Sequence, residues 1–193
     1  MKLTDILNGS YNLQEWEAKG YELPKYDIKA VAAKTYEEPT WVHFGAGNIF
    51  RAFTAAVLND VLNSGKYDRG IVVAETFDYE IIDKAYAPYE NLSLLVSLKS
   101  TGDIEKKVIG SVVESIKADY QFEADWARLV EIFRKPSLQM ISFTITEKGY
   151  ALRGMNGDLM PVVVADIAEG PDKARHAMAV VAAMMFYRFN AGA

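Results

Sequence analysis

The chain has 193 residues, half of them hydrophobic, with 26 acidic and 21 basic side chains and a formal net charge of -5. This composition excludes a wholly disordered chain and argues against a general nucleic-acid binder, which normally presents a basic face. The sequence contains no cysteine, which excludes disulfides, thiol nucleophiles and cysteine-ligated metal centres. No apolar run reaches the roughly 20 residues that span a bilayer, and the first residues lack a signal-peptide pattern. We therefore expect a soluble, cytoplasmic protein with neither a membrane nor a nucleic acid as partner.

Residues 1–38 have a mixed pattern that predicts an extension ahead of the main domain. Leu3, Ile6 and Leu7 suit one face of a short helix, after which glycines and a proline interrupt any longer element. We interpret this segment as an N-terminal extension that wraps over the domain that follows. A partly loose tail is the alternative, because chain ends are often poorly ordered.

Residues 41–74 predict a strand, a helix and a second strand. The run 41–44 is rich in β-forming residues, and after Gly47 apolar residues recur at helical spacing until Gly65 ends the helix. Residues 70–74 form a continuous apolar run, which is typical of a buried parallel strand. Together these three elements have the size of a βαβ unit.

The second half of the chain predicts more strands and helices. Residues 92–116 favour an antiparallel hairpin, or a small β-annex on the main sheet, with residues 108–113 on its return strand. An amphipathic helix follows at 122–133, then a strand at 138–146. A long final helix is predicted over residues 172–190.

These elements place the chain in the α/β class. We expect residues 39–193 to form one Rossmann-like domain: a mostly parallel sheet with flanking helices and a β-hairpin annex, preceded by the N-terminal extension. The final helix is apolar almost all round, so we expect it to be buried on more than one side.

The segment Gly45-Ala46-Gly47 lies between a predicted strand and a predicted helix. In a dinucleotide-binding turn, the first glycine allows the tight bend and the second lets the backbone approach a pyrophosphate. The backbone N–H groups at the start of the helix, from Asn48 and Ile49, then hold the phosphates. The alternative is the glycine turn of a βαβ unit that binds no ligand.

The residues around this turn depart from the usual pattern in part. Phe50 stands where a third small residue normally allows close packing of helix on strand, so either the helix stands farther off or Phe50 points away. Arg51 is placed to meet an anion. Glu75, 28 residues (75 − 47) after Gly47 where about 20 is usual, is the candidate ligand of the ribose hydroxyls, with Asp78 in reserve. An acid there favours NAD over NADP, because it repels a 2′-phosphate.

Residues 43–53 resemble the N-terminal fingerprint of the polyol-specific long-chain dehydrogenases, the mannitol dehydrogenase family. A second block, Ser-Phe-Thr-Ile-Thr-Glu-Lys-Gly-Tyr at 142–150, is similar to the Thr-x-Thr-Glu-x-Gly-Tyr segment of that family, and residues 108–111 resemble one of its strands. The resemblance runs from about residue 41 to residue 192. The second block and the long N-terminal extension favour the fructuronate reductases (D-mannonate oxidoreductases) over the mannitol 2-dehydrogenases and tagaturonate reductases.

The resemblance implies a Rossmann-type domain followed by a mostly helical domain that is not contained in this sequence. It implies NAD(H) or NADP(H) as cofactor without a metal, a keto sugar acid or polyol as substrate, and reduction of a ketone to an alcohol. The catalytic lysine, asparagines and histidine lie in the helical domain, so no catalytic residue is expected in this chain. The chain is thus expected to be an N-terminal fragment, partnered by the missing domain or by self-association through its last helix. Thr146 and Glu147 would lie near the nicotinamide.

Other functions stay open from the residues alone. A nucleotide-binding or interaction domain without catalysis fits the same pattern, and so, less well, does a flavin or other nucleotide-fold protein. We expect His43, which precedes the glycine turn, to be a buried structural side chain, and His176 to face solvent. Glu147 can equally be a capping or surface acid.

Overall fold

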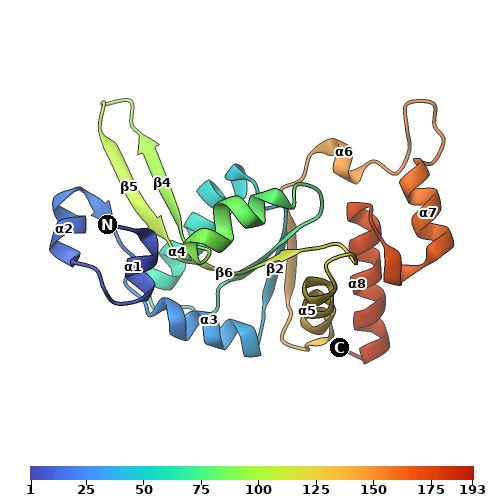
Figure 1. Cartoon of the computed structure of the whole chain (residues 1–193), viewed down its shortest axis with the longest axis horizontal. Helices are drawn as coiled ribbons and strands as arrows, with labels where there is room; N and C mark the ends of the chain where they lie inside the picture. The colour runs from blue at the N-terminus through green and yellow to red at the C-terminus, as the bar shows by residue number, and fades with distance from the viewer.

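The computed structural model describes residues 1–193, and its centre is a four-stranded parallel sheet (Figure 1). The strand order is β6-β3-β2-β7. The strands are β2 (Trp41–Phe44), β3 (Ile71–Glu75), β6 (Val112–Lys117) and β7 (Met140–Phe143). Every neighbouring pair is parallel, with Phe44 of β2 opposite both Ala74 and Phe143. The carboxyl ends of all four strands therefore meet at one edge, which confirms the predicted Rossmann-like sheet.

Helices cover both faces of this sheet because the sheet is apolar on both faces. All five residues of β3 are buried. Side chains alternate along a strand, so Val72 and Ala74 join one core with Phe133 and Met184, whereas Val73 joins a second core with other helices. The first core is covered by α5 (Glu123–Arg134) and α8 (Ala177–Ala191), and the second by α4 (Ala55–Asn63).

The helix predicted after Gly47 is present, and its first part is unusually wide. A π-helical segment, η1 (Phe50–Thr54), leads directly into α4. The helix stops near Gly65, whose φ of 70° lies in the left-handed region that favours glycine. After β3, the chain makes two further short helical segments, η2 (Ile82–Tyr86) and η3 (Ala87–Tyr89).

The predicted hairpin is confirmed, but its assigned extent is wrong. Strands β4 (Ser93–Leu98) and β5 (Ile104–Ile109) pair antiparallel, and β1 (Tyr21–Glu22) adds to β5 in parallel. Residues 112–116, however, form β6 of the main sheet and not part of the hairpin. Pairing with β3 buries Val112 and Ile116, which a hairpin projecting from the domain cannot do.

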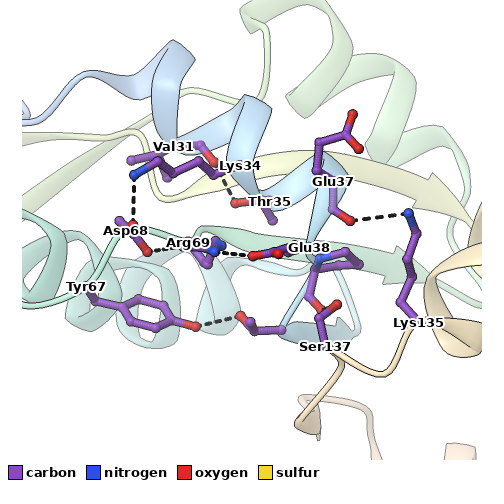
Figure 2. A network of polar contacts seen from close by, with 12 residues as sticks. Val31, Lys34, Thr35, Glu37, Glu38, Tyr67, Asp68, Arg69, Lys135 and Ser137 are labelled. Carbon is purple, nitrogen blue, oxygen red and sulfur yellow. Dashed lines mark hydrogen bonds and ion pairs between the residues drawn. The ribbon is translucent and has the colours of Figure 1, made fainter. Parts of the chain in front are cut away.

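The N-terminal residues form three helices, of which the third is fastened to the domain. These are α1 (Leu3–Leu7), α2 (Leu13–Ala18) and α3 (Ile28–Glu37). Figure 2 shows the polar contacts of α3 and the residues after it, near the amino ends of the strands. The buried Thr35 hydroxyl donates to the Val31 carbonyl at 2.7 Å and accepts the Gly70 N–H at 2.7 Å. Arg69 pairs with both Glu38 and Asp68. Residues 28–38 are therefore an integral layer of the molecule.

The last part of the chain differs from expectation in three ways. The predicted strand 138–146 ends at Phe143, and α6 (Glu147–Tyr150) follows. Next come α7 (Pro161–Glu169) and a short turn, η4 (Pro171–Lys173). The predicted helix 172–190 begins only at Ala177, because residues 174–176 are extended between η4 and α8. Finally, α8 packs against α5 (Figure 1) but leaves Phe189 82% exposed, so the expectation of burial on more than one side is wrong here.

His176 is buried, which corrects the expectation that it faces solvent. It precedes α8, where its Nδ1 accepts the Met178 N–H at 3.2 Å and its Nε2 lies 3.1 Å from the Ala151 carbonyl. The buried Asp166 carboxylate accepts the His176 backbone N–H at 2.9 Å. His176 therefore satisfies a free N–H at the start of α8. No helix in this structure combines the length and apolar character that crossing a membrane requires.

The contacts of α3 yield a stability prediction. Thr35→Val removes the acceptor of the buried Gly70 N–H, so we expect a loss of about 1–3 kcal/mol in the free energy of unfolding. Lys34→Ala removes only the half-exposed ion pair with Asp68, so its cost should stay below about 1 kcal/mol. Urea unfolding of both variants measures the difference, and equal losses would contradict the assignment of Thr35 as a buried anchor.

Candidate functional site

The glycine turn lies at the carboxyl edge of the central sheet, and its first glycine is required by the fold itself. Gly45 has φ = 105°, and a Cβ at this position would lie 2.6 Å from the Thr144 carbonyl oxygen. The Gly45 N–H donates to the Ala74 carbonyl, and the Thr144 N–H donates to the Phe44 carbonyl, both at 2.9 Å. The turn is therefore held between the ends of β3 and β7, where no side chain fits.

Gly47 has no such internal reason to be glycine. Its φ is not in the left-handed region, and no atom lies within 4 Å of the place that a Cβ would occupy. The backbone N–H groups of Gly47, Asn48 and Ile49 donate to no acceptor in the protein. An open backbone with three free N–H groups at the start of a helix is the arrangement that binds phosphate groups.

The Ala46 peptide is fixed on both of its polar atoms. Its N–H donates to Glu75 Oε2 at 2.7 Å, and its carbonyl accepts the Tyr86 hydroxyl at 2.7 Å. Ala46 itself is fully buried. The Ala46 N–H is therefore already used by the protein, and only the N–H groups that follow it are free for a ligand.

Glu75 ends β3 as predicted, but both oxygens of its carboxylate are engaged. Oε1 accepts the N–H groups of Thr76, Phe77 and Asp78 at 3.0, 2.9 and 3.3 Å. Oε2 accepts from Ala46, and Glu75 is only 7% exposed. A buried carboxylate is tolerated when N–H donors replace its lost water. Glu75 thus joins the glycine turn to the turn that follows β3. Of the two acids predicted as ribose ligands, Glu75 and Asp78, only Asp78 is exposed.

The structure also settles the orientation of Phe50. Its ring is fully buried and stacks on His43 of β2, with 4.2 Å between ring centroids. The ring thus lies between helix and sheet, where the pattern would place a small residue. Arg51 lines the cleft beside β4: its guanidinium bonds to Asn48 and lies 5.6 Å from the Tyr86 ring centre, and its buried Nε has no partner in the protein.

A chain of hydrogen bonds runs beneath the turn through His43. Trp41 Nε1 donates to Ser142 Oγ at 2.7 Å, and this oxygen lies 2.7 Å from His43 Nδ1. His43 Nε2 lies 2.9 Å from Thr144 Oγ1, whose hydroxyl donates to the Gly45 carbonyl at 3.3 Å. Because the Thr144 hydroxyl donates its proton to the Gly45 carbonyl, its oxygen can only accept from His43. We therefore assign the ring proton of His43 to Nε2.

His43 is a neutral structural residue, as expected from the sequence. It is 1% exposed, and this burial lowers its pKa to about 4. A protonated ring would place a second N–H against Ser142, whose oxygen already accepts from Trp41. His43 therefore supports the glycine turn from the sheet side and stays neutral at pH 7.

The last predicted site residues lie on the other side of the turn. Thr146 and Glu147 are exposed and lie at the start of α6, a few residues after the end of β7. Tyr86 and Thr144 were not predicted from the sequence as site residues, although Thr144 belongs to the family-like block at 142–150. Tyr86 gave no signal, because its contact with Ala46 joins segments 40 residues apart. On the outer side of the turn, a cleft of about 330 Å³ lies between Asn48, Arg51 and Ala52 on one wall and residues 93–96 of β4 on the other.

A parallel sheet with an open glycine turn at its carboxyl edge defines a Rossmann-type nucleotide-binding domain. The comparisons with known proteins agree with this class, although no family model matches the chain. D-mannonate oxidoreductase of Thermotoga maritima is 51% identical over 177 residues, which are 92% of this chain and 33% of that protein. Mannitol 2-dehydrogenase of Cereibacter sphaeroides is 32% identical over 173 residues, or 88% of this chain and 34% of that protein.

Two solved structures show the same fold. The ternary complex of Pseudomonas fluorescens mannitol 2-dehydrogenase with NAD and D-mannitol matches with a TM-score of 0.74 and 25% identity, over 94% of this chain and 36% of that one. A substrate-free D-sorbitol dehydrogenase matches with a TM-score of 0.73 and 27% identity, over 90% of this chain and 34% of that one. The chain belongs to the mannitol dehydrogenase family of oxidoreductases, and it spans about a third of the length of these relatives.

The two glycines of the turn should respond differently to the same small change. Gly45→Ala forces a side chain onto the Thr144 carbonyl at a positive φ, so we expect a loss of at least about 1–3 kcal/mol in the free energy of unfolding. Gly47→Ala meets no atom and should change that energy by less than about 1 kcal/mol. Denaturant unfolding of the two variants tests this, and comparable losses would show that Gly47 also serves the fold.

The buried His43 predicts a pH dependence of stability. Its pKa is about 4 in the folded chain against 6.5 when unfolded, so the unfolded state binds more protons between these values. The free energy of unfolding should therefore fall as the pH drops from about 6.5 to 4, by up to about 3 kcal/mol. Unfolding of the wild type and of His43→Asn across this range isolates the contribution. A ring resonance of His43 that titrates near pH 6.5 would contradict the assignment.

Proposed function

We propose that this chain is the NAD-binding domain of an oxidoreductase that interconverts a keto sugar acid and its alcohol. The observation that carries the cofactor part is the open face of Gly47 beside the free N–H groups of Asn48 and Ile49. A family relationship to D-mannonate oxidoreductase supports the substrate part. Mannitol, or the substrate of a tagaturonate reductase, is the alternative within the same family.

The residues present fit a dinucleotide. Gly45 makes the bend, the N–H groups of Gly47, Asn48 and Ile49 are free to hold a diphosphate, and the space that a Cβ of Gly47 would occupy is open. Arg51 adds a positive charge beside this helix start, where its guanidinium bonds to Asn48. Ala46 and Phe50 are fully buried, so their side chains support the shape of the turn and do not contact a ligand on its open face.

The acids at the edge support NAD as the preferred cofactor. Glu75 is engaged with backbone N–H groups, but its charge and that of the exposed Asp78 both lie in the turn after β3. Two carboxylates at this turn disfavour the additional phosphate of NADP. On the β7 side, Thr146 and Glu147 are exposed and available to the nicotinamide half.

NAD, when bound, accepts or supplies the hydride of such a reaction. The residues of this chain bind and orient it: the glycine turn fixes the diphosphate, and the buried Glu75 and His43 keep that turn in shape. We place the groups that move the proton and contact the sugar acid in the part of the longer relatives that this chain does not cover. That second domain is also its proposed partner, with α8 as an alternative surface for self-association.

Cofactor titration tests the proposal directly. NADH should bind saturably, measured by fluorescence, and NAD at 100 times its dissociation constant should stabilise the fold by about 2.7 kcal/mol. Gly47→Val should abolish binding while leaving the melting temperature of the ligand-free chain nearly unchanged, because space above Gly47 is open. Unchanged thermal stability of the wild type in excess NAD+ and NADP+ would overturn the proposal.

A further inference from the structure

One aromatic side chain at the carboxyl edge of the sheet has no role in the fold. Phe77, in the turn after β3, is 90% exposed. Ile49, in the helix start that follows the glycine turn at the same edge, is 72% exposed. Single exposed apolar side chains are common and by themselves need no explanation. Phe77 differs because the backbone that carries it is fixed.

The turn around Phe77 is fastened on both sides. The Phe77 N–H donates to Glu75 Oε1 at 2.9 Å, and Glu75 Oε2 accepts from Ala46 in the glycine turn at 2.7 Å. On the other side, the Tyr79 hydroxyl donates to Asp119 Oδ2 at 3.0 Å, and Asp119 lies in the turn after β6. The Phe77 ring therefore projects from a preorganised backbone, and a ligand that stacks on it pays little ordering entropy.

The two sides of the glycine turn offer different chemistry to a dinucleotide. If the diphosphate lies on the free N–H groups, one half of the molecule extends over β3 and β6 and the other over β7. The β7 side presents the polar Thr146 and Glu147, whereas the β3 side presents the exposed ring of Phe77. A purine ring gains about 1–3 kcal/mol from stacking on an aromatic side chain.

We propose that Phe77 is the stacking face for the adenine ring of the cofactor, an inference that rests on the proposed function. Glu75 is then a positioning residue: its carboxylate sets the spacing between the diphosphate turn and the aromatic ring. Asp78, the exposed acid next to Phe77, then binds the hydroxyls of the ribose that joins the adenine ring to the diphosphate.

Two ligands that differ only in the nicotinamide ring test this assignment, because ADP-ribose contains the adenosine, the diphosphate and the second ribose of NADH. Dissociation constants of NADH and ADP-ribose are measured by calorimetry for the wild type, Phe77→Ala, Phe77→Tyr and Phe189→Ala. Phe189 is the matched control, because it is 82% exposed but lies on α8. Phe77→Ala should weaken both ligands by the same factor, about 5- to 150-fold. Phe77→Tyr should retain wild-type affinity within about twofold, and Phe189→Ala should change nothing.

The outcomes separate this inference from the proposed function. Weaker binding of NADH alone would place Phe77 under the nicotinamide and overturn the inference. Unchanged binding of both ligands by Phe77→Ala, with binding lost in Gly47→Val, would overturn it while the cofactor site stands. Failure of the wild type to bind either ligand would overturn the proposed function and this inference with it. Melting curves of each ligand-free variant verify that the fold is intact.

Discussion

The candidate site depends on one buried carboxylate, that of Glu75. It accepts four backbone N–H groups from two turns that follow adjacent parallel strands. Removal of such a group leaves several buried donors without acceptors, and each carries a desolvation cost. Because the bonds go to both turns at once, the spacing between the glycine turn and the turn after β3 is set by a single side chain.

A second support lies beneath the same turn. His43 and Thr144 carry a directed chain of hydrogen bonds from Trp41 to the Gly45 carbonyl, across the interface of β2 and β7. The low pKa of His43 keeps this chain in one protonation state at neutral pH. The glycine turn is thus held from the side by a charged group and from below by neutral ones, and its outer N–H groups stay free.

The family relationship offers an explanation for the exposed apolar surface of α8. The relatives are about three times as long as this chain. Phe189 on α8 is largely exposed here, although the helix is apolar almost all round. A helix of this composition is usually covered on more than one face. The remaining part of the longer relatives is therefore our proposed cover for this surface.

Local sequence determined the elements of the fold and the place of the turn. The continuous apolar run ending at Ala74 indicates a strand that is buried on both faces. The helical spacing of apolar residues after Gly47 indicates a helix that is buried on one face. Both patterns are carried by residues that are close together in the sequence. Tertiary structure decided what local patterns cannot contain. Val112 joins the main sheet, His176 is buried, and Glu75 faces inward to Ala46, 29 residues away along the chain. These outcomes depend on which distant backbone N–H and carbonyl groups come within bonding distance, and only the packed sheet specifies that.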